Sequence, residues 1–133
     1  LGAGWEVWLD GGHNESAGQV LGAQARLWAE DEQAKPLHII LAMMKTKDPV
    51  RFIKPLAAFA ASVTVIPIEG EEMSWQPEEI AALLGAANTP CISSPGLEEA
   101  LASLASNEPG RVLVTGSLYL AGRVLSSLQS PFG

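Results

Sequence analysis

A carboxylate, an imidazole and an amide follow one another closely near the start of the chain, at Asp10, His13 and Asn14. The apolar, β-favouring run 7–9 precedes them, Gly11-Gly12 makes a turn, and a helical pattern begins directly afterwards. In open α/β sheets, ligands bind where a strand ends and a helix begins. The helix start adds unpaired N–H groups and positive partial charge, which suit a phosphate or a carboxylate. The stretch therefore predicts a site for an anionic ligand.

Each of these three residues also has a purely structural alternative. Asp10 can accept ribose hydroxyls, or it can cap backbone N–H groups within its own turn. His13 can contact phosphate or orient a nucleophile, or it can be an ordinary surface histidine. Asn14 can cap the following helix, and that role alone would explain it. The glycine turn joined to His13 and Asn14 favours the ligand site for Asp10.

Two further candidates follow later apolar runs. Lys45 and Lys47 come after residues 37–44, a near-continuous apolar run typical of a strand covered on both faces. They can pair with an anionic substrate or be solvated loop lysines. Ser117 follows the run 111–115, and its amide or hydroxyl can bind a carboxylate or simply cap a helix. The sequence has no G-x-S-x-G elbow, which argues against a serine hydrolase, and no Cys and His spacing that suggests a zinc site.

The elements that position these residues alternate between strand and helix along the chain. We predict strands over residues 7–9, 37–44, 62–68, 89–92 and 111–115, and helices over residues 15–31, 50–60, 77–86, 94–106 and from 118 onward. This alternation predicts an α/β fold, with a Rossmann-like, mostly parallel sheet and helices on both faces. His38 lies near the start of its strand, where a structural or surface role is expected. Trp75 is expected to anchor the acidic loop 69–76 by packing.

Composition limits the possible partners. The chain has 133 residues, which indicates one domain, and eight basic against fifteen acidic residues give a net charge of −7. No basic cluster is available for nucleic acid or an anionic membrane, so we expect neither as a partner. Cys91 is the single cysteine, which excludes an internal disulfide and favours the cytoplasm. Neither a signal peptide nor an apolar run of about 20 residues is present.

The chain starts a few residues before a strand, without Met, and lacks a phosphate-binding loop of the G-x-x-x-x-G-K-[ST] type. We therefore expect residues 1–133 to be one domain excised from a longer protein.

Three segments of the chain resemble the folylpolyglutamate synthase/dihydrofolate synthase family. Residues 9–14, LDGGHN, resemble its L-D-G-A-H-N stretch, and residues 44–48, MKTKD, resemble its M-x-D-K-D loop. Residues 114–122, VTGSLYLAG, are similar to its T-G-S-L-Y-L-x-G segment. The three segments occur in the family's order across essentially the whole chain. Glu15 stands where the family often has proline, and Thr46 replaces the usual first aspartate of the loop.

The resemblance implies the C-terminal domain of a Mur-ligase-type enzyme, whose phosphate-binding loop and magnesium ligands lie in a preceding central domain. Such an enzyme uses ATP and Mg²⁺ to phosphorylate a carboxylate of dihydropteroate or a folate. The amine of L-glutamate then attacks, which gives an amide and ADP. The domain would be a lid, inactive alone, in a monomeric cytoplasmic enzyme.

The family's roles transfer residue by residue. Asp10 would hold the nucleotide's ribose, with Asn14 as a second ATP-binding residue. His13 would be the catalytic residue near the phosphates and the incoming amino acid. Lys47 and Ser117 would hold glutamate's carboxylates. None of these residues would be a metal ligand.

Two other classes of protein are alternatives to this family. A receiver-like regulatory module needs an acid at the end of the third strand and a lysine after the fifth, where this chain has Ile68-Glu69 and Gly116-Ser117. A Mur ligase of cell-wall synthesis is the other alternative. The segment 116–120, GSLYL, favours the folate branch.

Overall fold

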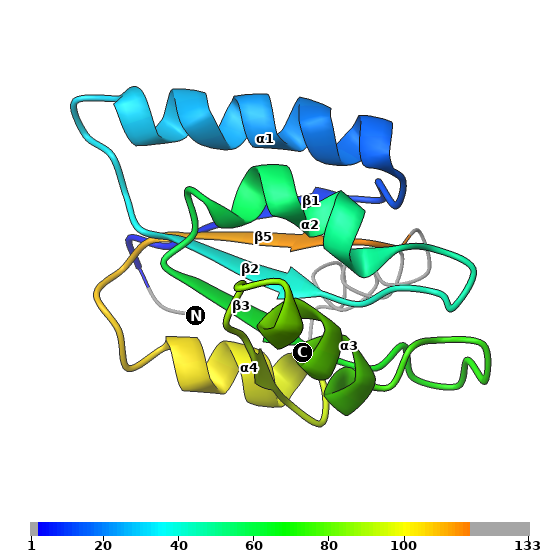
Figure 1. The fold of residues 1–133 in the computed structure, drawn as a ribbon. Coiled ribbons are helices and arrows are strands. Elements are labelled where there is room, and N and C mark those ends of the chain that lie inside the picture. Colours follow the sequence, from blue (N-terminus) through cyan, green and yellow to red (C-terminus); the bar gives the residue numbers. More distant parts are fainter. Residues whose placement is uncertain (1–2, 118–133) are drawn as a thin grey trace.

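The computed structural model describes residues 3–117 as a parallel sheet with helices packed on both faces (Figure 1). The strands are β1 (Glu6–Asp10), β2 (Leu37–Leu41), β3 (Ser62–Val65), β4 (Ile92–Ser93) and β5 (Arg111–Thr115). The helices are α1 (Glu15–Glu30), α2 (Pro49–Ala57), α3 (Pro77–Ala86) and α4 (Leu97–Leu104). The helix expected from residue 118 onward lies outside the described residues.

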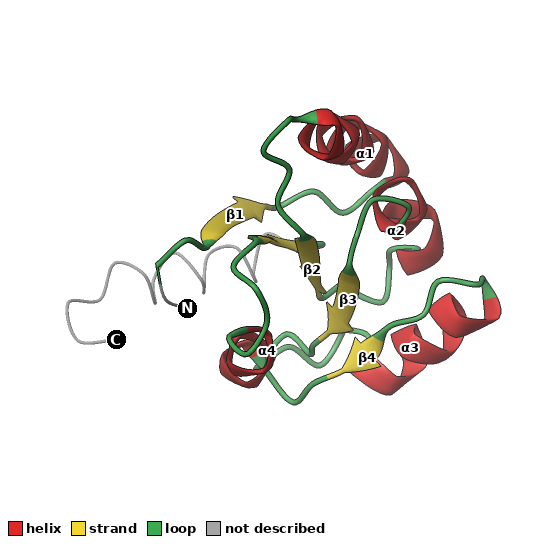
Figure 2. Ribbon diagram, turned by 90° about the vertical axis from the view of Figure 1, so that its left-hand side faces the viewer, coloured by secondary structure: helices red, strands yellow, loops and turns green. Residues whose placement is uncertain are grey.

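The strand order in the sheet is β1-β5-β2-β3-β4, and all neighbouring strands are parallel. The chain moves in one direction from β1 through β2 and β3 to β4, and then returns to insert β5 between β1 and β2. Because crossovers between parallel strands are right-handed, the return places its helix on the opposite face. Accordingly, α1, α2 and α3 cover one face and α4 covers the other (Figure 2). The predicted Rossmann-like α/β class is confirmed.

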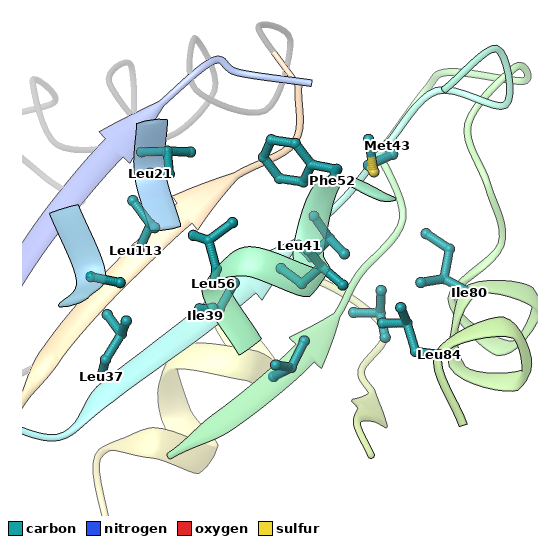
Figure 3. Close-up of a cluster of buried hydrophobic side chains, with 14 residues drawn as sticks. Leu21, Leu37, Ile39, Leu41, Met43, Phe52, Leu56, Ile80, Leu84 and Leu113 are labelled. Atoms are coloured by element: carbon teal, nitrogen blue, oxygen red, sulfur yellow. The ribbon is translucent and has the colours of Figure 1, made fainter. Parts of the chain in front are cut away.

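The central strand β2 divides its side chains between two cores. Leu37, Ile39 and Leu41 face α1, α2 and α3, where they pack with side chains of those helices (Figure 3). Ile40 faces α4 and packs with Val114 of β5. Burial on both faces is the reason that this strand reads as an uninterrupted apolar run. Complete burial of each such side chain stabilises the fold by roughly 1.5–3 kcal/mol.

Helices α1 and α2 approach each other closely because glycines of α1 face α2. A Cβ at Gly18 would lie 2.3 Å from the backbone oxygen of Phe52, and a Cβ at Gly22 would lie 2.7 Å from Cβ of Pro55. Pro55 has no N–H to continue the helical ladder, and α2 ends soon after it at Ala57. The expected helix to residue 60 is therefore too long.

Two predicted strands are also too long at their carboxyl ends. The apolar run 37–44 is a strand only to Leu41, and Met44 instead forms an isolated antiparallel bridge with Ser74. The run 62–68 ends as a strand at Val65, shortly before Pro67, which has no N–H for a ladder. None of the helices within residues 3–117 is long and apolar enough to cross a membrane.

Candidate functional site at the carboxyl edge of the sheet

The polar turns of the chain meet at the carboxyl edge of β1, β5 and β2. Asp10 and Thr115 are register partners at the ends of β1 and β5, and Leu41 of β2 pairs with Thr115 on its other side. Beyond the strands, the Gly116 amide donates to the Gly12 carbonyl at 3.0 Å. The turn that carries Asp10 is thus joined directly to the turn that leads to Ser117.

Asp10 shapes its own turn. Its Oδ1 accepts a hydrogen bond from the Gly12 amide at 2.7 Å, which is the structural role considered for it. The residue is half-buried, and its second carboxylate oxygen has no hydrogen bond to any of residues 3–117. One oxygen therefore fixes the turn, and the other is available to accept a hydroxyl of a ligand.

Asn14 is the N-cap of α1. Its backbone is extended, and its Oδ1 accepts from the Ala17 amide at 2.8 Å. The structural alternative for Asn14 is thus confirmed. Because the cap uses the side-chain oxygen, only the NH₂ group of the amide remains for a ligand.

His13 is half-buried between the glycine turn and this cap. Its Nδ1 is buried and has no hydrogen-bond partner in the part of the chain that the structure describes. An unpartnered buried polar nitrogen costs about 1–3 kcal/mol, so a partner supplied by a ligand would offset that cost. The position fits a residue that contacts phosphate or orients a nucleophile.

The turn after β5 requires glycine. Gly116 has φ +105°, and a Cβ there would lie 2.3 Å from the backbone oxygen of Ala42. Ser117 is only 2% exposed, so its side chain is covered in this structure. Direct contact between the Ser117 hydroxyl and glutamate would therefore require the side chain to be uncovered.

Thr115 is a polar residue of this edge that the sequence reasoning did not single out. It is 1% exposed, and its Oγ1 has no hydrogen-bond partner among the described residues. In the sequence, Thr115 could have been recognised as the one polar residue that follows Arg111 in this strand, at its carboxyl end.

The two lysines after β2 have different surroundings. Lys45 is exposed, and its Nζ lies 3.8 Å from Oε1 of Glu79. Lys47 is half-buried and has no ion pair within residues 3–117. Its backbone carbonyl accepts a hydrogen bond from the Trp75 indole at 3.0 Å. The expectation that Trp75 anchors its loop by packing is confirmed, since its ring packs against the core beneath α1, α2 and α3.

His38 lies at the opposite end of the sheet and is structural. It is 6% exposed, its Nδ1 lies 2.7 Å from Oγ of Ser62, and its ring lies 5.8 Å from that of Trp5. Burial lowers the pKa of His38 because the charged imidazolium loses its hydration. A neutral, packed imidazole at this position has no access to the carboxyl edge.

The structure thus brings Asp10, His13, Asn14 and Ser117 to one edge, with Lys47 on the loop of the neighbouring strand. Within residues 3–117, no group of three or more His, Cys, Asp or Glu side chains could hold a metal ion. The fold and site define an open α/β domain of the kind that binds nucleotides and other anions at its carboxyl edge.

Comparison with protein families identifies the family to which this α/β domain belongs. The family described as "Dihydrofolate synthetase, C-terminal domain" matches residues 2–127. The chain belongs to this family. No curated protein sequence matches it.

Solved structures with related names share the fold. Folylpolyglutamate synthase of Mycobacterium tuberculosis, complexed with ADP and AMPPCP, is similar at 21% identity and TM-score 0.74, over 93% of this chain and 30% of that chain. FolC of E. coli, in complex with DHPP and ADP, is similar at 19% identity and TM-score 0.78, over 96% of this chain and 29% of that chain.

A bifunctional folylpolyglutamate synthase/dihydrofolate synthase with Mn, AMPPNP and L-glutamate bound is similar at 17% identity and TM-score 0.78, over 98% of this chain and 30% of that chain. The chain therefore spans less than a third of the length of each of these proteins. At such identities the likeness establishes the fold.

Proposed function

We propose that this chain is the lid domain of an ATP-dependent, ADP-forming ligase that adds L-glutamate to dihydropteroate, to folates, or to both. One observation carries the proposal: the family-like segments 9–14, 44–48 and 114–117 are far apart in sequence but lie at or just beyond the carboxyl ends of three adjacent parallel strands. Similar structures contain ADP, AMPPNP, Mn and L-glutamate, which supports a nucleotide, a divalent metal and glutamate as ligands of the whole enzyme.

The nucleotide is assigned to the β1 turn. The free carboxylate oxygen of Asp10 accepts a ribose hydroxyl, and the Asn14 NH₂ group donates a second hydrogen bond to ATP. ATP supplies the phosphoryl group that activates the acceptor's carboxylate. Mg²⁺ accompanies ATP, and we assign its ligands to the rest of the enzyme, because residues 3–117 contain no cluster of three or more His, Cys, Asp or Glu side chains that could hold it.

His13 is assigned to the reacting end of the site. Its buried Nδ1 lacks a partner in the described chain, and it bonds a phosphate oxygen or the attacking amine once closure of the domain uncovers it. A neutral imidazole can also accept the proton that the amine loses as the amide forms. Lys47 binds a carboxylate of glutamate as a point charge. Ser117 contributes its backbone amide, or its hydroxyl once that side chain is uncovered.

The domain acts by closing on the rest of the enzyme. Closure holds the amine beside the activated carboxylate and excludes the water that would hydrolyse it. We further propose that the enzyme is a monomer. We also propose that it is cytoplasmic, in line with the lone free Cys91.

The test uses the full-length protein, supplied with ATP, Mg²⁺ and glutamate. We expect ADP release that depends on glutamate and on dihydropteroate or tetrahydrofolate. Replacement of Asp10 by Ala should raise the KM for ATP at least tenfold while thermal unfolding stays cooperative. Turnover only with a muramyl nucleotide acceptor would overturn the folate assignment. An unchanged KM for ATP in Asp10→Ala would overturn the ribose assignment.

A further inference from the structure

The loops after β2 and β3 are tied together beyond the edge of the sheet. The Lys45 amide donates to the Met73 carbonyl at 2.6 Å, and the Trp75 amide donates to the Met43 carbonyl at 2.8 Å. These bonds flank the antiparallel bridge between Met44 and Ser74. The acidic loop 69–76 therefore serves as a backbone support for the loop that carries Lys47.

The Trp75 side chain extends this support to Lys47 itself. Its indole Nε1 donates to the Lys47 carbonyl at 3.0 Å, and its ring packs against the core. On the other side, the Lys47 amide donates to the Met44 carbonyl at 3.0 Å. Both the amide and the carbonyl of Lys47 are thus hydrogen-bonded within the domain. Asp48 follows immediately and caps α2 through the Val50 amide.

The same arrangement separates the two lysine charges. Glu79 lies beside Lys45 and also accepts a hydrogen bond from the Gln76 amide at the start of α3. The charge of Lys45 is therefore partly balanced within the domain. Lys47 has no ion pair in the described part of the chain, so its charge remains for an external anion.

We propose that Trp75 is a positioning residue for glutamate: its indole N–H fixes the backbone of Lys47, and Lys47 meets a carboxylate of the incoming amino acid. The inference rests on the proposed glutamate role of Lys47. Because the backbone of Lys47 is already fixed before glutamate binds, Lys47 loses less conformational freedom on binding. Loss of the indole bond therefore weakens glutamate binding and leaves the nucleotide site unchanged.

The experiment compares Trp75→Phe with Trp5→Phe in the full-length protein. Phenylalanine keeps the aromatic packing at position 75 and removes the donor. Trp5 is the matched control, because its indole has no hydrogen bond to the residues described here and it lies at the other end of the sheet. We expect Trp75→Phe to raise the KM for glutamate roughly three- to tenfold, the range of one ordinary hydrogen bond. The kcat and the KM for ATP should stay within twofold, and Trp5→Phe should change none of the three.

Lys47→Ala and the double variant Lys47→Ala/Trp75→Phe complete the test. If Trp75 acts through Lys47, the double variant has the same KM for glutamate as Lys47→Ala. If the fold increases in the KM for glutamate of the two single variants multiply in the double variant, the two residues act independently and the positioning role is overturned. An unchanged KM in Trp75→Phe beside a raised KM in Lys47→Ala would overturn it too, with the role of Lys47 intact. An unchanged KM in Lys47→Ala would instead overturn the glutamate role of Lys47, and the inference with it.

Discussion

The two histidines of the chain lie at opposite ends of the same sheet and have opposite surroundings. His38, at the start of β2, is packed beside Trp5 and lies within hydrogen-bond distance of Ser62. His13, beyond the end of β1, has a buried Nδ1 with no partner among the described residues. His38 holds two strands together through Ser62, whereas the Nδ1 of His13 has no bond within the described residues, which fits the role proposed for it.

The charged groups of the two ends differ in the same way. At the amino end, Nε of Arg111 donates to Oε2 of Glu6 at 2.9 Å, and Nη2 lies 2.8 Å from the same oxygen. The guanidinium also lies 4.5 Å from the Trp28 ring centroid. Although His38 and Arg111 each keep one buried nitrogen without a partner, their other nitrogens are used inside the fold. At the carboxyl end, Lys47 has no ion pair within residues 3–117. The charges of the amino end are thus paired within the fold, whereas at the carboxyl end the Lys47 charge and one oxygen of Asp10 have no partner within residues 3–117.

The largest effect is expected from breaking the turn that joins β5 to the β1 turn. Gly116→Ala places a Cβ against the backbone oxygen of Ala42 at a φ that alanine rarely adopts. We expect a loss of about 3 kcal/mol in the free energy of unfolding, together with loss of activity. Denaturant titration measures the first. A stability within 1 kcal/mol of the original would show that the turn adapts to a side chain.

A smaller effect is expected from breaking the charged pair at the amino end. Glu6→Gln keeps the shape of the side chain but removes the charge that Arg111 contacts, which should cost about 1 kcal/mol of unfolding free energy. Activity should stay unchanged, because the pair lies far from the carboxyl edge. Glu30→Gln is the matched control: its pair with Arg26 is largely exposed, and its loss should cost less than about 0.5 kcal/mol. Equal costs would contradict the account of the amino end.

The smallest effect is a pH dependence due to His38. Because burial lowers the pKa of His38, the unfolded chain takes up the proton first as pH falls, below about 6.5. The contribution of His38 to stability is therefore complete above about pH 6.5 and is lost as pH falls toward its lower folded-state pKa. The pH profile of thermal unfolding should be flatter in this window for His38→Gln. An identical slope in the variant would assign the dependence to other groups.

Local chemistry explains what the sequence could predict. Pro77 followed by acids predicted α3 with its observed bounds, and the run 111–115, typical of a buried strand, predicted β5 residue for residue. The weak strand expected over residues 89–92 is the short β4, which begins only at Ile92. Asn14 was recognised as a possible cap because the cap forms within a few residues.

Contacts between distant segments could not be predicted. The bond between Trp75 and Lys47 joins residues 28 positions apart, and nothing in either local pattern indicates it. The insertion of β5 between β1 and β2 likewise depends on how the whole chain packs. That insertion brings Gly116 to Gly12 and so completes the candidate site.

The most direct test of the central claim pairs His13→Gln with His38→Gln in the full-length protein, with glutamate-dependent ADP release and thermal unfolding as readouts. If the carboxyl edge is the reacting edge, His13→Gln lowers kcat/KM about a hundredfold and leaves the unfolding temperature unchanged. His38→Gln then lowers the unfolding temperature and keeps kcat/KM within twofold. Full activity in His13→Gln, or an equal loss of activity in both variants, would contradict the claim that the two ends of the sheet serve different purposes.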